Sequence, residues 1–108
     1  DDAATTEIDD AFSVTRLPGG NWRIGIHIAA PALGIDLSSE AERCARARLS
    51  TVYYPGGKIT MLPEPVIGAF TLAEDRWCPA LSLYVEAAPD FSVVAFDSRI
   101  ESVNVVSN

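Results

Sequence analysis

The first part of the sequence alternates apolar and polar positions with a period of two. Residues 12–15 alternate in this way, residues 17–21 hold proline, glycine and asparagine, and residues 22–28 alternate again. A turn-rich stretch between two alternating runs predicts a β-hairpin. Successive side chains of a strand point to opposite faces, so Trp22 and the isoleucines of the second run share one face, which we expect to face the core. His27 falls on the other face.

The middle of the sequence carries a helix signal after an expected loop at residues 31–37. Ser39 stands three positions before Glu42, the spacing of a capping box, and we expect a helix from about residue 40 to residue 50. The arginines at positions 43, 46 and 48 form a basic strip on this helix. We expect the strip to face water rather than to bind an anion.

Three further strands are predicted after this helix. Residues 51–54 form a short strand that ends at a Pro-Gly-Gly turn, and residues 61–65 indicate an irregular connection stiffened by proline. Residues 80–87 and 91–106 are expected to form two longer strands around a turn at residues 88–90, with a bend in the second. The pattern predicts an α+β fold with a largely antiparallel β-sheet and at least one packed helix.

Composition is typical of a globular domain. The chain has 108 residues, of which 48% are hydrophobic and 21% charged, enough for the core of one domain. No apolar run approaches the ~18 residues of a membrane helix, so no membrane partner is expected.

Cys44 and Cys78 lack metal-ligand spacing and are expected to be buried thiols rather than a disulfide. The chain opens in a charged segment without Met, which suggests a piece of a longer polypeptide.

The net charge of −7 is concentrated at the start of the chain, where the first ten residues hold five acidic side chains and no basic one. Asp1, Glu7 and Asp9 share a face if this segment is extended, and a bend before residue 12 brings in Asp10. Carboxylates without cysteine suit a hard cation such as Mg²⁺ or Mn²⁺, and four of them suffice for two ions that act on a phosphoryl group. A structural ion site and a plain acidic surface are the alternatives that the spacing leaves open.

Four segments, in order, resemble the motifs of one family. Residues 1–11 resemble an Asp followed after five residues by Asp-x-Asp-Asp-Ala, and residues 27–29 resemble the strand that follows it. Residues 50–55 resemble a Ser-Val-Tyr-Phe-Pro segment, and residues 61–64 resemble Met-Leu-Pro-Glu. Together they make the chain similar, nearly end to end, to the catalytic domain of the ribonuclease II and ribonuclease R family, the RNB exoribonucleases.

The resemblance implies a Mg²⁺-dependent exoribonuclease, with Mn²⁺ as the alternative ion, that degrades single-stranded RNA from its 3′ end to nucleoside 5′-monophosphates. Carried over by position, the metal ligands are Asp1, Glu7, Asp9 and Asp10, and Asp9 and Asp10 are also catalytic. Tyr53 is the aromatic residue that stacks on a base near the 3′ end. Without the motif around it, Tyr53 would be interpreted as a core residue of its strand.

The resemblance also implies that residues 1–108 are a fragment of a single RNB-like catalytic domain from a bacterial cytoplasm. Family members are several times longer than this chain. The expected partners are therefore single-stranded RNA, the rest of the RNB domain, and OB- or S1-type domains that deliver RNA. The fragment alone is expected to have little or no activity.

Two departures from the family pattern keep other functions open. Glu7 stands where the family has Asp, and residues 30–31 are Ala-Pro where ribonuclease R-like members have Asp-Val. A degenerate RNB paralogue that grips RNA without cutting it is one alternative. The other is a non-enzymatic, β-rich binding module whose acidic cluster holds a structural ion or a basic partner.

Overall fold

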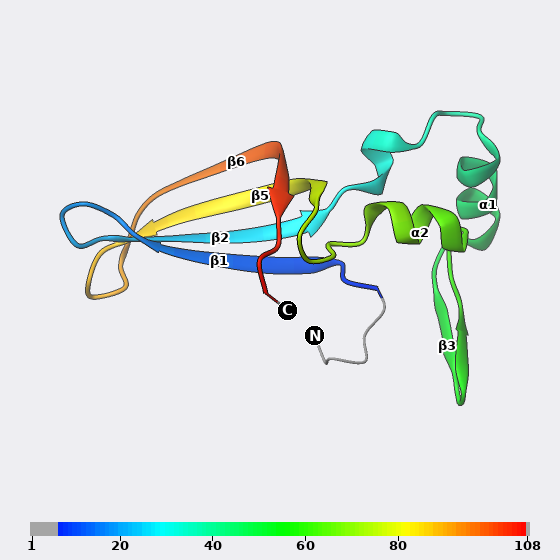
Figure 1. The fold of residues 1–108 in the computed structure, drawn as a ribbon, viewed down its shortest axis with the longest axis horizontal. Coiled ribbons are helices and arrows are strands. Elements are labelled where there is room, and N and C mark those ends of the chain that lie inside the picture. Colours follow the sequence, from blue (N-terminus) through cyan, green and yellow to red (C-terminus); the bar gives the residue numbers. More distant parts are fainter. Residues whose placement is uncertain (1–6, 108) are drawn as a thin grey trace. The chain divides into compact units, whose positions relative to one another are not determined.

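The computed structural model describes residues 7–107, which form two compact units. One unit comprises the residues up to Ala30 and those from Thr71 on, and the other comprises residues 31–70. In chain order the elements are β1 (Asp10–Arg16), β2 (Trp22–Ala29), the short 3₁₀ helix η1 (Pro31–Gly34), α1 (Glu40–Arg48), β3 (Val52–Tyr54), β4 (Gly57–Ile59), α2 (Glu64–Phe70), β5 (Trp77–Ala87) and β6 (Val93–Asn104), as Figure 1 shows.

β1 and β2 form the predicted hairpin at one edge of a four-stranded antiparallel sheet with the order β1-β2-β5-β6 (Figure 1). The register places Asp10 opposite Ile28. The Leu17 N–H donates to the Asn21 carbonyl oxygen at 2.8 Å and closes the turn. The two glycines between them have φ of 96°, a conformation that glycine adopts without strain.

β5 and β6 form a second, longer hairpin, which confirms the two strands predicted in this region. β5 begins earlier than predicted, at Trp77. The carboxylate of Asp90 accepts hydrogen bonds in the turn from the hydroxyl and the N–H of Ser92, at 2.6 and 3.0 Å. These bonds hold the pKa of Asp90 below its ordinary value, the hydroxyl contributing most.

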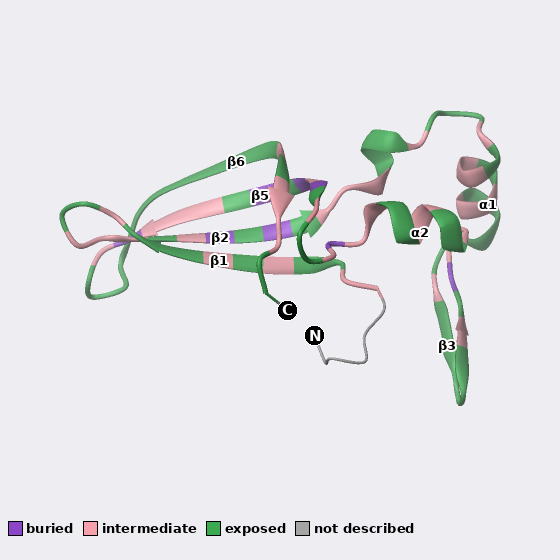
Figure 2. Cartoon of the chain, viewed as in Figure 1, coloured by how far each residue is buried: buried purple, intermediate pink, exposed green. Residues whose placement is uncertain are grey.

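The expectation that the isoleucine row of β2 faces the core is wrong for the described residues. Ile26 and Ile28 are 45% and 47% exposed, whereas Gly25 and His27 are buried on the opposite face. Figure 2 shows buried stretches on β2 and β5 and a largely exposed β6. Alternation shows which residues share a face, but a covering layer decides which face is buried.

β5 repeats this arrangement. Cys78 and Ser82 are at most 1% exposed, whereas Leu81 and Leu83 are 51% and 39% exposed. Small side chains on the buried face leave room for the segment that begins at Thr71, whose carbonyl oxygen accepts from the Cys78 thiol at 3.3 Å. The core of this unit therefore lies on the small-residue face of the sheet.

In the unit of residues 31–70, α1 begins as the capping box predicts and ends two residues earlier than expected. Ser39 is the N-cap, and its hydroxyl accepts from the Glu42 N–H at 3.2 Å. The Glu42 carboxylate pairs with Arg46 one turn later. After Arg48, Leu49 adopts a left-handed conformation with φ of 67° and ends the helix.

The basic strip of α1 is tied to the protein more than the sequence suggested. Arg43 donates to the carbonyl oxygen of Ser38, and Arg48 donates to that of Thr60 at 2.7 Å. The side chain of Arg46 is 75% exposed despite its pairing within the helix. All three arginines are exposed, as expected for a strip that faces water.

β4 and α2 were not predicted, and α2 begins at Glu64, inside the stretch expected to be irregular. The carbonyl oxygen of Pro63 accepts from the N–H groups of Val66 and Ile67 at 3.0 and 3.1 Å. Pro65 falls in the first turn, where a missing N–H costs no helical bond. Proline therefore helps to begin a helix here rather than preventing one.

The antiparallel sheet and the two α-helices confirm the predicted α+β fold. Both cysteines are free, as expected, but Cys78 is buried and Cys44 only half-buried. Within residues 7–107, no helix is long and apolar enough to span a membrane.

Candidate functional site

The carboxylate motif lies where the chain enters the edge strand β1. Asp10 is the first residue of β1 and pairs with Ile28, and the carbonyl oxygen of Asp9 accepts from the Ala29 N–H at 2.8 Å. Asp9 and Asp10 are exposed and Glu7 is half-buried. β2 thus fixes the main chain of both aspartates while leaving their side chains accessible.

Ile8 provides a second anchor for the same segment. Its N–H donates to the Thr71 hydroxyl at 2.7 Å, and its carbonyl oxygen accepts from the Leu72 N–H at 2.9 Å. Ile8 lies between Glu7 and Asp9 in the sequence, so these bonds restrict the main chain on both sides. The motif is therefore tied down by two segments from elsewhere in the same unit.

The chemistry of the motif fits a hard cation, because carboxylate oxygens are the ligands that Mg²⁺ and Mn²⁺ prefer. Asp1 falls outside the described residues, so its place beside Glu7, Asp9 and Asp10 stays a prediction. Among residues 7–107, no three His, Cys, Asp or Glu side chains gather as a metal site. The described residues show that the main chain at Ile8, Asp9 and Asp10 is held in place. That four carboxylates converge on one cation remains a hypothesis.

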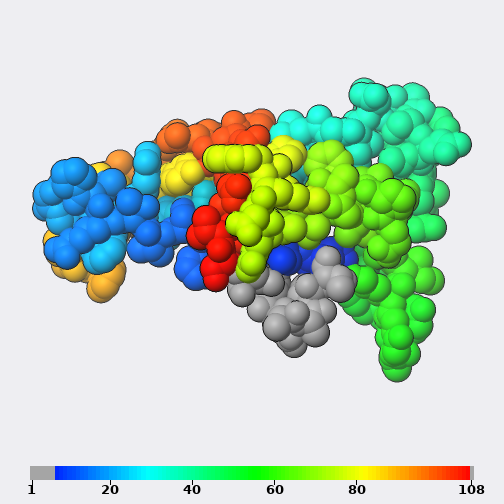
Figure 3. All heavy atoms as spheres, viewed as in Figure 1, coloured from blue at the N-terminus to red at the C-terminus, as the bar shows by residue number. Residues whose placement is uncertain are grey.

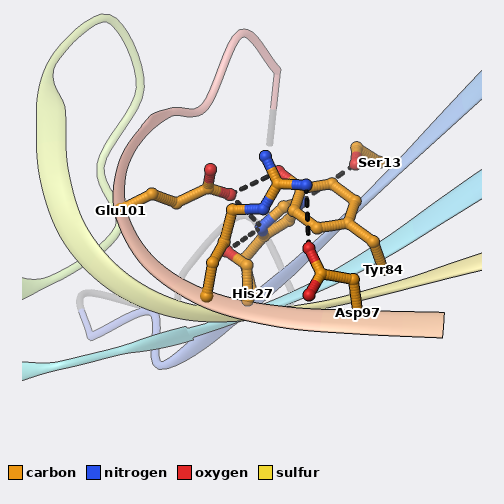
Figure 4. Close-up of polar contacts among 7 residues, drawn as sticks. Ser13, His27, Tyr84, Asp97 and Glu101 are labelled. Carbon is orange, nitrogen blue, oxygen red and sulfur yellow. Dashed lines mark hydrogen bonds and ion pairs between the residues drawn. The ribbon is translucent and has the colours of Figure 1, made fainter.

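A series of polar side chains crosses all four strands next to this motif (Figure 4). The ring of His27 in β2 lies between Ser13 of β1, 2.9 Å from Nε2 to Oγ, and Ser82 of β5, 2.7 Å from Nδ1 to Oγ. A carboxylate oxygen of Glu101 in β6 lies 3.9 Å from Nδ1. The edge of one ring meets the face of the other between His27 and Tyr84, with centroids 5.6 Å apart. We call these five residues the His27 cluster.

Tyr84 and Glu101 change each other's ionisation within the cluster. The Tyr84 hydroxyl donates to the Glu101 carboxylate, and this bond lowers the pKa of Glu101 and raises the pKa of Tyr84. The guanidinium groups of Arg23 and Arg99 lie 4.9 and 4.7 Å from the centroid of the Tyr84 ring. Arg99 also pairs with Asp97 at 3.1 Å. These contacts hold the tyrosine ring against neighbouring strands.

Sequence reasoning gave the His27 cluster no role. It placed His27 outside the apolar row, and it did not connect Ser13 with Ser82, which lie far apart in the sequence. The one available signal was Gly25, a glycine in the middle of a predicted strand. Such a glycine often marks a close approach of other atoms.

Asp10, Ser13 and His27 line a groove of about 740 Å³ along β1. Val105 belongs to its other wall, at the C-terminal end of the described residues. A parallel bridge holds Val105 beside Glu74, and in Figure 3 the red C-terminal segment lies against the yellow-green segment that contains Glu74. The groove therefore opens next to one of the predicted catalytic carboxylates.

Tyr53 lies in the β3–β4 hairpin of the unit of residues 31–70. It is 72% exposed, and the register places it opposite Lys58. An exposed ring is available to stack on a base, which a core tyrosine is not, so the interpretation as a core residue does not hold for the described chain. Tyr53 and the carboxylates belong to different units, and their action on one RNA end stays a prediction.

The described chain is an antiparallel sheet whose edge strand β1 begins at an acidic segment that is held in place by β2 and by the segment at Thr71. The RNB domain model matches residues 1–107, and the chain belongs to this family. It is 37% identical over 99 residues to an uncharacterized ribonuclease of Synechocystis, covering 86% of this chain and 15% of the relative. It is 34% identical over 109 residues to exoribonuclease 2 of Vibrio cholerae, covering 100% and 16%. The chain thus spans about a sixth of the length of these relatives.

Solved structures share the fold. RNase R of Mycoplasma genitalium, in complex with ribose-methylated single-stranded RNA, matches with a TM-score of 0.85 at 19% identity, over 98% of this chain and 17% of that one. Yeast Ssd1, a pseudonuclease, matches with a TM-score of 0.83 at 21% identity, over 89% and 12%. At these identities the likeness shows the fold alone, and the fold by itself does not establish cleavage.

Proposed function

We propose that the full-length protein is an exoribonuclease that hydrolyses single-stranded RNA from its 3′ end to nucleoside 5′-monophosphates, with Mg²⁺ or Mn²⁺ as cofactor. The observation that carries the proposal is the carboxylate motif, which is held at the start of β1. All of this chain aligns with exoribonuclease 2. The proposal concerns the whole protein, because this chain spans about a sixth of its relatives.

Asp1, Glu7, Asp9 and Asp10 would hold the cation. When bound, it would neutralise charge on the phosphoryl group and activate a water for attack at phosphorus. The exposed carboxylates of Asp9 and Asp10 can accept a hydrogen bond from that water, which makes them the proposed catalytic residues. A bound cation would also reverse the local field, so that an acidic segment accepts a phosphate backbone.

Tyr53 would stack on a base near the 3′ end. Stacking on an aromatic ring is worth ~1–3 kcal/mol per base and tolerates any sequence, as a general RNA-degrading enzyme requires. The exposure of the Tyr53 ring supports this role, because a ring in contact with solvent is open to a base.

The remaining parts of such an enzyme would lie elsewhere in the polypeptide. The face of the sheet that carries Ile26 and Ile28 is called the isoleucine face. It also carries Phe12, Phe96 and Ile100, which are 80%, 78% and 66% exposed. So large an apolar face favours a covering layer, which we assign to the rest of the RNB domain, with OB- or S1-type domains delivering RNA. We expect the isolated chain to be inactive.

Its two free cysteines suit a reducing compartment such as the bacterial cytoplasm.

Asp9→Asn in the full-length protein tests the proposal. We expect hydrolysis of a single-stranded RNA to be abolished while RNA affinity stays nearly unchanged, because the substitution removes charge handling in the transition state rather than contacts to substrate. Asp36→Asn is the matched control, since Asp36 is exposed in the loop before α1. An equal loss of binding and hydrolysis in Asp9→Asn would show that the role is misassigned.

A non-catalytic RNA-binding function is the second candidate, and Glu7 favours it. Its side chain is one methylene longer than the aspartate of the family pattern, which displaces the carboxylate. The pseudonuclease Ssd1 has the same fold as this chain. If the longer side chain has weakened catalysis, Glu7→Asp in the full-length protein should raise hydrolysis, and an unchanged rate would contradict this candidate.

A further inference from the structure

The His27 cluster begins at the register position that follows the carboxylate motif. His27 pairs with Ala11 of β1, one residue after the motif. The next two residues of β2 are those that pair with Asp10 and donate to the carbonyl oxygen of Asp9. A shift of β1 at the level of His27 would therefore move both aspartates.

Within the described residues β1 is an edge strand, paired on one side by β2. Ser13 adds a side-chain bond to this pairing, through its hydroxyl and Nε2 of His27 at 2.9 Å. The other ring nitrogen contacts the fully buried hydroxyl of Ser82 at 2.7 Å. A neutral imidazole has one donor and one acceptor nitrogen, and two hydroxyls satisfy both. Ser13 thus ties the edge strand to the interior of the sheet.

Gly25 leaves room for this bond. A Cβ at position 25 would lie 2.7 Å from Nε2 of His27 and closer still to Oγ of Ser13. Both contacts are far inside van der Waals distance, so a larger residue would push the two partners apart. Glycine is unfavourable in a strand interior, and here it makes space for the Ser13–His27 pair.

We infer that His27 is a positioning residue that acts through Ser13 on the carboxylate motif. The inference rests on the proposed function, since it concerns ligands of the proposed cation. Groups behind metal ligands hold them in the binding geometry and so raise the affinity for the ion. Loss of the Ser13–His27 bond would loosen β1 where its first residue, Asp10, presents its carboxylate.

Mn²⁺ binding by the full-length protein tests the inference, followed by the EPR signal of the free ion. Ser13→Ala is the main variant, because His27→Ala would remove a buried ring that also contacts Ser82 and Tyr84 and would threaten the fold. We expect Ser13→Ala to bind Mn²⁺ about tenfold more weakly, at the low end of effects seen for such supporting groups. Its kcat should fall without a change in KM for RNA, and excess Mn²⁺ should restore part of the rate.

Two further variants complete the design. Ser13→Thr keeps the hydroxyl and should bind Mn²⁺ as the unaltered protein does. Ser98→Ala is the matched control, since Ser98 is exposed on the opposite face of the same sheet. Suppose that Asp9→Asn abolishes Mn²⁺ binding but that Ser13→Ala and Ser98→Ala bind Mn²⁺ equally well. This result would overturn the positioning role and leave the proposed function standing. Mn²⁺ binding that Asp9→Asn leaves unchanged would overturn the proposed function as well.

Discussion

The hydroxyl of Tyr84 donates a hydrogen bond to the carboxylate of Glu101 and joins β5 to β6 on the His27 side of the sheet. The bond lowers the pKa of Glu101 from its ordinary 4.5 and raises the pKa of Tyr84 from its ordinary 10.0. The contribution of Glu101 to stability is therefore present above pH 4.5 and is lost as the pH falls through the lowered pKa. The contribution of Tyr84 is present below pH 10.0 and is lost as the pH rises through the raised pKa.

We predict that Tyr84→Phe lowers the free energy of unfolding near neutral pH by about 1 kcal/mol, the net value of such a bond in a partly exposed place. The difference from the unaltered protein should shrink as the pH falls through the lowered pKa of Glu101. Denaturant unfolding of the full-length protein over a pH series measures it, with Tyr54→Phe in β3 as the control. A difference that stays constant through the acid range would mean that the bond does not depend on the charge of Glu101.

Gly25→Ala and Gly68→Ala should change stability in opposite directions. A Cβ at position 25 collides with the Ser13–His27 pair, and such overpacking costs about 1–3 kcal/mol. A Cβ at position 68, in α2, meets nothing within 4 Å. Alanine there should stabilise the helix by about 0.5–1 kcal/mol. Unfolding free energies of the two variants check this, and destabilisation by both to the same extent would remove the special role given to Gly25.

The elements with local signals were predictable from the sequence. The turn residues at 17–21 lie between two alternating runs, and Ser39 carries its capping partner three residues on. α2 was missed because Pro63 and Pro65 resemble helix breakers, although the first turn of a helix tolerates proline. The acidic residues of the carboxylate motif lie within ten positions of one another, so the sequence names them, but their convergence on one cation stays a prediction.

Features that depend on distant residues were not predictable. Alternation in β2 defines two faces, but the segment that begins at Thr71 decides which of them is buried in the described residues. His27 gains its partners only when β1 and β5 pair on either side of β2, and Ser82 lies 55 residues away along the chain. The spacing of residues in the sequence does not show which residues of two distant strands will lie opposite each other.

Ile100→Lys in the full-length protein tests whether the isoleucine face of the sheet is covered there. Ile100 lies on this face, opposite Leu81, and is 66% exposed in the described chain. If another part of the polypeptide covers it, the variant buries a charge and should lose more than about 2 kcal/mol of stability. Leu37→Lys, at a loop residue that is 84% exposed, is the control. Equally small losses in both variants would argue that the face stays open to solvent.

Tyr53→Ala should lengthen the shortest RNA that the full-length protein leaves undigested. Removing the ring removes a stack worth ~1–3 kcal/mol per base, so short products are held too weakly to be cut further. A 5′-labelled RNA digested to completion and resolved by length gives the answer. Tyr54→Ala is the neighbouring control, since Tyr54 faces the other side of the β3 strand. The same product length in both variants would exclude stacking by Tyr53.

The fate of a 3′-terminal label tests the central claim most directly. The full-length protein, supplied with Mg²⁺ and a single-stranded RNA labelled in its last nucleotide, should release the label as a nucleoside 5′-monophosphate while the rest of the RNA is still nearly full length. Asp9→Asn should release none. Label that appears first in oligonucleotides, or that stays in intact RNA with the unaltered protein, would contradict the assignment of this chain to a 3′-to-5′ exoribonuclease.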